Sequence, residues 1–524
     1  MLPMVTAAPA HLLRAPAPAP APPTLDEHQR RVVDHPGGPL LVLAGPGTGK
    51  TTTLVEALVE RIEQRGASPD QVLALTFSRK AAEQLRDRVT ARLGRTLASP
   101  LASTFHSYAY ALIRRYAPAE LYDAPLRLLS APEQDVVLRE LLSDAPESVT
   151  WPAGLERALG TRGFAKEVHA VLSRAREKGL DGHALATLGH EHRLPEFVAA
   201  GLFLEQYLTV LDAQGATDYA DLLRRAVLEA EEHRAELRSE LRHVFVDEYQ
   251  DTDPGQVALL RALAGDGRDL VVVGDPHQSI YGFRGAEVRG ILEFPGAFPH
   301  RDGRPADVVA LRTTRRFGPR VLVASQRIAG RLGLPGSIPE EARVAFLSPV
   351  AEPPAGLGAG RVEVRTFDTD RAEAEHLADL LRRAHLERGI AWHDMAVLVR
   401  SGRTTIPGLR RALVAAGVPV EVAADEVPLV RDPAVLPLLE ALRFVVRRGD
   451  AVVDPEPEPG PEIGPETEPD GGVDPALTPV DGRAEALLLG PLGGLDAGDL
   501  RRLARRLRSE EHTSELQSPM YLVC

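Results

Sequence analysis

The feature that most constrains this chain is the stretch from Pro39 to Thr53, PLLVLAGPGTGKTTT. Leu40 to Leu43 form a short apolar run, typical of a strand buried in a parallel sheet. The glycines that follow let the backbone turn tightly, so that its amides and the start of the next helix face one centre. A strand, a Gly-rich turn and a helix in this order predict a cradle for the phosphates of a nucleoside triphosphate. The alternative is a chance Gly-rich turn.

Two side chains of this cradle carry chemistry. Lys50 is placed to reach the terminal phosphates, and the Thr51 hydroxyl is the expected magnesium ligand. The motif G-x-x-x-x-G-K-S/T has glycine where this chain has Ala44, so Ala44 must avoid positive φ. A dinucleotide motif, G-x-G-x-x-G, is not satisfied because Lys50 stands at its last glycine. The nucleotide-binding residues expected in the loop are Ala44, Gly45, Pro46, Gly47, Thr48, Gly49, Lys50, Thr51 and Thr52.

Composition is that of a soluble globular protein. No apolar run is long enough to cross a bilayer, and the Pro-rich N-terminus lacks a signal peptide's apolar core, so we expect a cytoplasmic protein without a membrane partner. The only cysteine is Cys524, which excludes internal disulfides and cysteine-ligated zinc. The net charge is −13, or −5 without the eight acids between Asp454 and Asp474. Any basic groove for nucleic acid must therefore be local.

Strands and helices alternate on either side of a purely helical stretch. Apolar strands are expected at 71–78 and from 102, with helices at 52–64 and 79–93. Between about 117 and 215 the pattern is of amphipathic helices alone, which predicts a helical insertion. Strand patterns return at 243–256 and 269–286. This order predicts an α/β fold with a parallel sheet covered on both faces.

The strand Val244–Val246 ends in two carboxylates, Asp247 and Glu248. Asp247 is suited to holding magnesium through water, and Glu248 to orienting and deprotonating an attacking water. Two acids after a strand could instead be a solvated loop, but the cradle upstream disfavours that alternative.

The last of these strands continues into GDPHQSIYGFRGA. Here Gln278 could contact the terminal phosphate, while Tyr281 and Phe283 could stack on unpaired bases, worth about 1–3 kcal/mol per base. Core packing is the alternative for each ring. Gln29, ahead of the phosphate strand, could read the adenine edge, although such glutamines are commonly solvated.

Together these motifs resemble the UvrD/Rep-type superfamily 1 DNA helicases, in order from Gln29 to about Leu507. DEYQDT and GDPHQSIYGFRGA are far more specific than a phosphate loop alone. The resemblance implies a 3'-to-5' translocase on single-stranded DNA that uses ATP and Mg²⁺, acts on 3'-tailed duplexes and serves DNA repair or recombination. It also implies two RecA-like domains, each interrupted by a helical insertion.

The resemblance assigns a role to each matching residue. It implies that Gln29 reads adenine, that Asp247 holds the metal with Thr51, and that Glu248 is the catalytic base. Gln250 matches a coupling residue, and Gln278 the phosphate sensor. The residues expected to contact DNA are Thr76, Phe77, Arg79, Thr104, Phe105, His106, Tyr281, Phe283 and Arg284. At the position of Phe283 relatives more often have tryptophan, and a structural role is the alternative for His106.

The resemblance extends into a second motor domain that we expect to open after Val308. LRTTRRF at 311–317 resembles the family's L-x-x-N-Y-R-S and places Arg316 on an arginine that reaches the γ-phosphate. Thr314 and Arg315 replace the usual Asn and Tyr, and a plain surface arginine is the alternative. Segments 361–369 and 394–402 are expected strands, with a helix at 374–387 between them.

We expect an incomplete gene product. Two further family motifs, one with a second γ-phosphate arginine, are not found, and RSEEHTSELQS at 508–518 resembles a translated sequencing adapter. Such an arginine is worth about 10³–10⁵ in rate, so weak or absent hydrolysis is expected. The expected division is a lead at 1–23, the first RecA-like domain at 24–116 and 216–307, its insertion at 117–215, the second domain at 308–449, an acidic linker at 450–480, a second insertion starting at 481–507 and a foreign tail at 508–524.

Other functions and partners also follow from the residues. The segment GPGTGKTTTLVEA resembles that of actinobacterial family members that carry a nuclease domain. This resemblance implies a helicase–nuclease partner subunit. One alternative is a nucleotide-responsive single-strand DNA-binding module without unwinding activity, and strand displacement would separate the two. A small-molecule kinase is disfavoured by GDPHQSIYGFRGA, and DNA-stimulated hydrolysis would exclude it.

Overall fold

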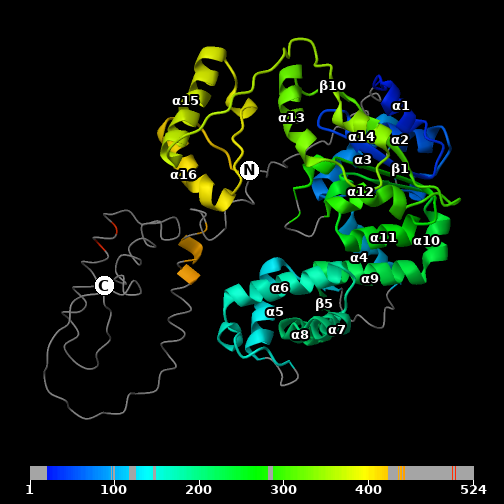
Figure 1. Cartoon of the computed structure of the whole chain (residues 1–524), viewed down its shortest axis with the longest axis vertical. Helices are drawn as coiled ribbons and strands as arrows, with labels where there is room; N and C mark the ends of the chain where they lie inside the picture. The colour runs from blue at the N-terminus through cyan, green and yellow to red at the C-terminus, as the bar shows by residue number, and fades with distance from the viewer. Residues whose placement is uncertain are drawn as a thin grey trace, which may run out of the picture. The chain divides into compact units, whose positions relative to one another are not determined.

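The computed structural model (Figure 1) describes residues 21–95, 97, 101–116, 126–144, 149–280, 282 and 287–422, with short stretches between 435 and 502. The lead up to residue 20, the acidic linker at 450–480, most of 481–507 and the tail at 508–524 lie outside the described residues. Predictions for those segments therefore stay predictions. Among the helices that are described, none is long and apolar enough to cross a membrane.

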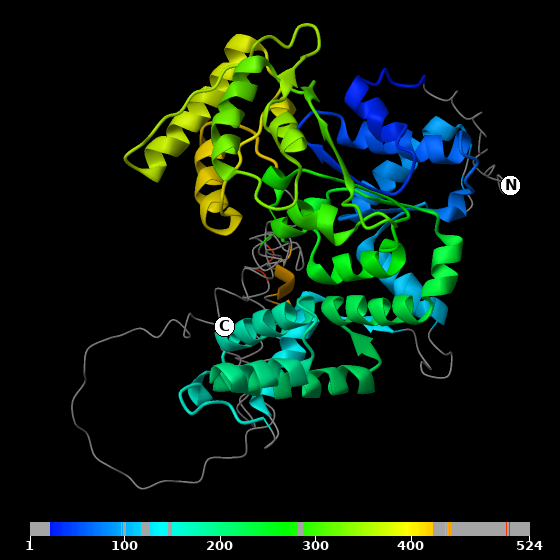
Figure 2. The ribbon, with the colours of Figure 1, turned by 45° about the vertical axis from the view of Figure 1, so that its right-hand side comes forward.

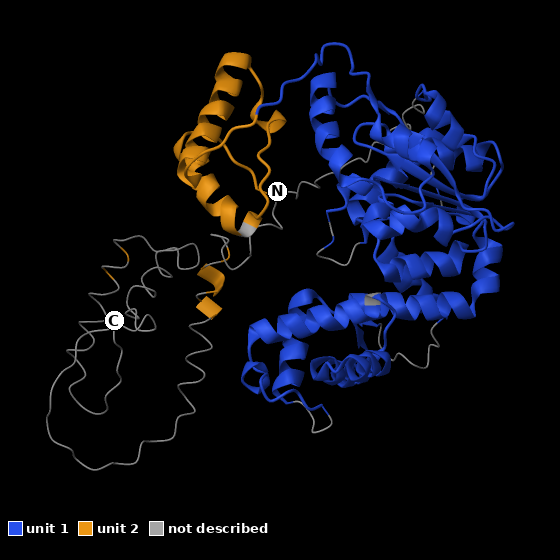
Figure 3. Cartoon of the chain, in the orientation of Figure 1, with its two compact units in different colours: residues 1–363 blue, residues 364–524 orange. Residues whose placement is uncertain are grey.

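The chain divides into two compact units, residues 1–363 and 364–524 (Figure 3). The first unit is built on a six-stranded sheet in the order β3-β2-β6-β7-β1-β8, with every neighbouring pair parallel. Its strands are β1 (Pro39–Ala44), β2 (Val72–Thr76), β3 (Ala102–Thr104), β6 (His243–Val246), β7 (Asp269–Gly274) and β8 (Asp307–Leu311). This confirms the predicted α/β class and one RecA-like domain.

Strand β8 lies at the edge of this sheet. It pairs with β1 in the register Leu41↔Val308, and Ala310 and Leu311 are buried there. The predicted boundary after residue 307 therefore falls inside a strand of the first unit, because these apolar residues cover the open side of β1. A short ladder follows, in which β9 (Thr313–Thr314) pairs with β10 (Val350–Ala351).

Helices connect and cover the strands of the sheet. Helix α3 has the bounds that its sequence predicts, with Ser78 as a side-chain cap and Gly94 in the left-handed region at its end. The helices of the first unit outside the helical segment are α1 (Glu27–Val33), α2 (Lys50–Glu63), α3 (Arg79–Leu93), α4 (Phe105–Tyr116), α9 (Tyr219–Glu232), α10 (Arg234–Glu240), α11 (Pro254–Ala264), α12 (Val288–Ala297), α13 (Pro319–Leu332) and α14 (Glu340–Leu347).

A helical segment leaves the sheet after α4, as the amphipathic pattern predicts. It contains α5 (Ala131–Ser143), α6 (Arg162–Glu177), α7 (Gly182–His192) and α8 (Pro195–Ala213), which lie together to one side of the sheet (Figures 1 and 2). These helices have their own core around Phe203 and Tyr207. A two-stranded ladder, β4 (Arg127–Leu128) with β5 (Ala216–Thr217), closes the segment where the chain enters and leaves it.

The second unit is described in part. Helices α15 (Asp370–Arg388) and α16 (Gly402–Ala415) pack around Ala378 and Leu413, which confirms the helix expected at 374–387. The strands expected at 361–369 and 394–402 are not formed in the structure. A strand needs a hydrogen-bonded neighbour, and no ladder pairs these segments among the residues described here. A second RecA-like sheet therefore stays a prediction.

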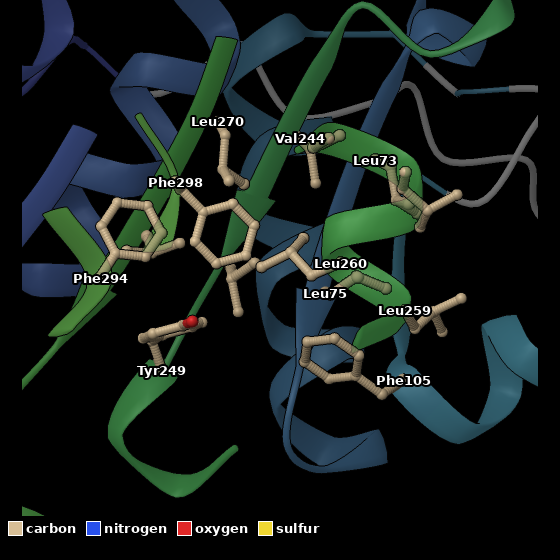
Figure 4. Close-up of a cluster of buried hydrophobic side chains, with 14 of the residues drawn as sticks. Leu73, Leu75, Phe105, Val244, Tyr249, Leu259, Leu260, Leu270, Phe294 and Phe298 are labelled. Carbon is tan, nitrogen blue, oxygen red and sulfur yellow. The ribbon is translucent and has the colours of Figure 1, made fainter. Parts of the chain in front are cut away.

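The core of the first unit follows from the alternation of side chains along β1. Leu41 and Leu43 belong to one buried cluster, whereas Leu40 and Val42 belong to another. Successive residues of a strand point to opposite faces, so each face of the sheet has its own core. Figure 4 shows the first cluster, in which side chains of α4, α11 and α12 pack on the sheet. Helices on both faces fix the strand ends, where the polar residues lie.

Candidate functional site

The phosphate loop connects β1 directly to α2. Gly47 and Gly49 have φ of 77° and 88°, a region that L side chains rarely adopt, so glycine is required at both positions. Ala44 is the buried last residue of β1 and is not among the non-glycine residues with positive φ, as predicted. Helix α2 begins at Lys50, and no side chain caps its N-terminus. Its free backbone amides can therefore receive an anion.

Residues 314–316 lie against the phosphate loop, and two of them hydrogen bond to it. The Thr314 hydroxyl donates to the Pro46 carbonyl at 2.8 Å, and the Arg315 amide donates to the Gly47 carbonyl at 2.9 Å. A Cβ on Gly47 would lie 2.4 Å from Cβ of Arg316. Arg316 is thus adjacent to the phosphate loop, exposed, and without an ion-pair partner in the described part of the chain. This place is compatible with the predicted reach to a γ-phosphate.

Gln29 also contacts the loop. Its Nε2 donates to the Thr48 carbonyl at 3.1 Å, and its Oε1 accepts from the Asp26 amide at 3.0 Å. Asp26 in turn accepts from Arg315 at 3.0 Å. In the structure Gln29 therefore fixes the loop to the start of α1, while its adenine-reading role stays a prediction. Asp26 was a candidate helix start in the sequence, and the structure confirms it with a D-x-x-Q capping box. Its ion pair with Arg315 was not predicted.

The two predicted carboxylates lie at the carboxyl end of β6. Asp247 is nearly buried and accepts from the Glu248 amide at 3.0 Å. Burial, together with the neighbouring charge of Glu248, raises the pKa of Asp247 to about 6. Glu248 has φ of 51°, a left-handed conformation that costs a non-glycine residue about 1–3 kcal/mol. Strain of this size at a carboxylate beside the phosphate loop indicates a functional constraint.

A continuous set of hydrogen bonds joins five side chains across three strand ends. Nζ of Lys50 donates to Glu248 at 2.7 Å, and Nε2 of Gln250 donates to the same carboxylate oxygen at 2.9 Å. Oε1 of Gln250 accepts from the Asp275 amide at 2.9 Å, and the Asp275 carboxylate accepts from Gln278 at 2.6 Å. We call this set, Lys50–Glu248–Gln250–Asp275–Gln278, the carboxyl-edge relay.

Asp275 is the member of the relay that sequence reasoning missed. It is fully buried, and burial raises its pKa. It follows β7 directly, just as Asp247 follows β6, so a carboxylate at a strand end was the signal available. Asp251, also missed, accepts from Gln250 at 3.2 Å, and burial together with Glu248 raises its pKa to about 6.

The donor set for a divalent cation is a hydroxyl and a carboxylate. Oγ1 of Thr51 has no hydrogen-bond partner among the described residues, and only one oxygen of Asp247 accepts a protein hydrogen bond. Hard cations such as Mg²⁺ prefer oxygen ligands of this kind. The residues therefore fit the predicted metal, with Thr51 and Asp247 as the side chains that would hold it.

Six of the nine residues predicted to contact DNA lie at or just after the ends of two neighbouring strands of the sheet. Thr76 and Thr104 are register partners at the carboxyl ends of β2 and β3. Both are buried, and their hydroxyls hydrogen bond locally, to the Ser78 carbonyl and the Ser107 hydroxyl. The two segments are thus side by side, on the same edge of the sheet as the relay.

The side chains around these threonines differ in exposure. Phe105 is 2% exposed and packs in the core (Figure 4), whereas Arg79 is exposed at the start of α3. Phe77 is partly exposed. The His106 ring packs edge-on against Tyr219 at 5.1 Å, and burial lowers the pKa of His106 to about 4. Tyr281, Phe283 and Arg284 lie outside the described residues.

A protein-family model and several known proteins match this chain. The family model is that of the UvrD/REP helicase N-terminal domain, and it matches residues 25–299. The ATP-dependent DNA helicase UvrD1 of Mycobacterium tuberculosis is 30% identical over 456 residues, 84% of this chain and 55% of the relative. DNA helicase II of Escherichia coli is 30% identical over 59% of this chain and 41% of its own length. UvrD2 of Mycobacterium tuberculosis is 33% identical over 58% and 43%. The chain spans about half the length of the curated relatives that it matches.

Proposed function

This chain belongs to the UvrD/REP family of superfamily 1 helicases, and on that premise we propose that it binds and hydrolyses ATP at the phosphate loop to move 3' to 5' along single-stranded DNA. The observation that carries the proposal is the carboxyl-edge relay, in which Lys50, Glu248 and Gln278 are joined by hydrogen bonds. The direction of movement follows from the family resemblance alone.

The relay supports a defined order of events. Lys50 is paired with Glu248, so the terminal phosphates of ATP compete with that carboxylate for the ammonium group. Once Lys50 turns to the phosphates, the Glu248 carboxylate is free to accept a proton from water. Gln250 still holds one Glu248 oxygen, which keeps the base oriented. The water oxygen then bonds to the γ-phosphorus as the bond to the β–γ bridging oxygen breaks, and Glu248 takes the proton.

Charge at the phosphates is balanced by groups around the loop. In this proposal the amides of the loop and of α2 bind the phosphates, and Arg316 contacts the γ-phosphate. The uncapped start of α2 and the position of Arg316 beside Gly47 support these roles. Magnesium, when bound, neutralises phosphate charge, and Thr51 and Asp247 would hold it. These groups stabilise the charge that spreads over the transferring phosphoryl oxygens.

The relay also supports coupling to DNA. Ser279 donates to the Gln250 carbonyl at 3.1 Å, so the segment that follows Gln278 is bonded to the relay. That segment leads to Tyr281 and Phe283, the predicted base-stacking residues. A change at the phosphates can thus reach the strand contacts through Gln250 and Asp275 without a large movement.

The wider function of the whole protein belongs to the same proposal. We assign it a second RecA-like domain in the part of 308–449 that follows β8, and 3'-tailed duplex DNA as substrate. We also assign it a role in repair or recombination, a helicase–nuclease partner subunit and the cytoplasm as its location. These assignments rest on the family resemblance. The relatives are named as ATP-dependent DNA helicases, which supports them.

The experiment is steady-state ATP hydrolysis by the chain, with and without a single-stranded oligonucleotide. Hydrolysis by this chain is expected to be weak, and we expect DNA to stimulate what remains. Glu248→Gln should lower that rate about 10²–10⁴-fold with ATP still bound. Glu191→Gln, at an exposed glutamate of α7, is the matched control and should behave as the parent. Hydrolysis by Glu248→Gln at the parent rate would contradict the assignment. If the parent binds ATP and DNA without hydrolysis, the binding-module alternative is correct.

A further inference from the structure

The opposite edge of the same sheet carries a cavity of about 500 Å³. It is lined by the loops that lead into β1, β6, β7 and β8. Strands in the sheet are parallel, so this amino edge is separated from the phosphate loop by the length of β1, about 20 Å for six residues. Five arginines line the cavity: Arg238, Arg242, Arg268, Arg301 and Arg304.

Two of these arginines are held in place by backbone carbonyls. Nε of Arg238 donates to the Ala262 carbonyl at 3.0 Å, and Nη1 of Arg268 donates to the Arg238 carbonyl at 2.8 Å. Carbonyls orient a guanidinium without cancelling its charge. Arg268 also forms an ion pair with Asp266 at 2.8 Å. Both arginines are therefore pre-positioned, and Arg238 is only weakly paired, at 4.0 Å from the same aspartate.

The acidic groups around the cavity are already engaged. Asp269 accepts from Arg61 at 3.0 Å and from the His243 ring at 2.6 Å. Asp302 accepts from Arg304 at 2.8 Å. Oδ1 of Asp269 is buried without a hydrogen-bond partner, and neither carboxylate forms an ion pair with Arg242 or Arg301 among the described residues.

Arg242 and Arg301 are the exposed arginines without partners. Neither forms a hydrogen bond or ion pair through its side chain among the described residues. Burial lowers the pKa of Arg238, and the charge of Asp266 opposes that shift.

We propose that this amino-edge cavity binds phosphate groups of the DNA backbone, at a contact separate from the predicted strand track on the carboxyl edge. Planar guanidinium groups match phosphate oxygens, which favours a phosphate ligand. Among the lining residues the only ring is that of His300, so the cavity offers no stacking platform and reads no sequence. A chain with a net charge of −13 needs such a local positive site to hold a polyanion. The choice of DNA rests on the proposed function.

The test measures binding of the full chain to a labelled 3'-tailed duplex and a labelled single strand by fluorescence anisotropy over a range of salt. We compare the parent with Arg242→Ala/Arg301→Ala and with Arg139→Ala/Arg157→Ala. The second pair is a control of exposed arginines in the helical segment that have no partner among the residues the structure describes. Each duplex phosphate contact contributes about −0.9 to the slope of log K against log salt. We expect the cavity pair to reduce the duplex slope by about 1.8 and the control pair to leave it unchanged.

The outcomes separate the possible failures. An unchanged slope in the cavity pair, or an equal fall in both pairs, would overturn the cavity assignment, provided that thermal unfolding matches the parent. Titration with tripolyphosphate distinguishes the phosphate source: loss of tripolyphosphate binding with DNA binding intact would overturn DNA as the ligand. If the parent itself binds no DNA, the proposed function fails first.

Discussion

The two edges of the parallel sheet use charged residues in different ways. At the carboxyl edge, Lys50, Glu248 and Gln250 hydrogen bond to one another. At the amino edge, Arg61 is fully buried, pairs with Asp269 at 3.0 Å and also donates to the Val33 and His35 carbonyls at 2.6 and 3.1 Å. A partly exposed pair can exchange partners when a ligand arrives, whereas a buried side chain that is also bonded to backbone holds loops in place. The carboxyl edge is thus suited to chemistry, and the buried part of the amino edge around Arg61 to stability.

The largest expected effect is at the amino edge. Arg61→Met removes one of the two partners of buried Asp269 and leaves the Val33 carbonyl without its donor, whereas the His35 carbonyl keeps Arg65. Because a buried carboxylate then loses its guanidinium, we expect the free energy of unfolding to fall by about 3–5 kcal/mol. Urea denaturation measures this change, with Arg139→Met as the exposed control. A loss below about 1 kcal/mol would mean that this edge is not a stabilising framework.

The second-largest effect is expected at the carboxyl edge. Asp275→Ala leaves the Gln278 amide without its acceptor, and losing a hydrogen bond to a charged group costs about 1.5–3 kcal/mol. We expect DNA-stimulated kcat to fall about ten- to a hundred-fold with little change in ATP affinity. Asp302→Ala, at the amino edge, should leave kcat unchanged. Equal losses in the two variants would erase the proposed distinction between the edges.

At the carboxyl edge, the contribution of Asp247 to stability depends on pH. Its pKa is raised from 3.8 to about 6, so its contribution to stability is full below pH 4 and is lost as pH rises through 6. Asp247→Asn should therefore stabilise the protein by about 1–2 kcal/mol at pH 8, and not at pH 4, when divalent cations are chelated. Urea midpoints at the two pH values measure this. Destabilisation at pH 8 would show that the carboxylate is not penalised by its burial.

The smallest effect is expected from the pair that joins α1 to the residues behind the loop. Arg315→Ala breaks a partly exposed ion pair with Asp26, and such pairs contribute about 0.2–1 kcal/mol. We expect KM for ATP to rise no more than about five-fold, with kcat unchanged. A large fall in kcat would place Arg315 in the chemistry rather than in support of the loop.

The sequence predicted those parts of the fold and site whose signals are local. The phosphate loop, the bounds of α3 and the acids after β6 follow from apolar runs, caps and glycines within a few residues. Contacts between distant segments were not predictable in this way. The ion pair of Asp26 with Arg315 joins residues 289 positions apart, and Asp275 reaches the relay only because β7 lies beside β6.

The strands predicted in the second unit show the same limit, because a local pattern was present and no strand is formed. Segment 361–369 alternates apolar and polar residues, and segment 394–402 contains an apolar run, but Val364 and Leu398 are 89% and 94% exposed in the structure. A period-two pattern states which face a strand would bury and does not supply the neighbouring strand. Likewise, the segment that forms β8 was expected to open a second domain, because its place beside β1 depends on the rest of the sheet and not on a local pattern.

The central claim is that the carboxyl-edge relay couples nucleotide to DNA, and one measurement tests it directly. Single-strand DNA affinity is measured with and without a non-hydrolysable ATP analogue, in the parent, in Gln250→Ala and in the exposed control Gln214→Ala. Coupling free energies between sites are about 1–3 kcal/mol, or roughly 5- to 150-fold in affinity. We predict a ratio in this range for the parent and the control, and a ratio near one for Gln250→Ala. A parent-like ratio in Gln250→Ala would contradict the account.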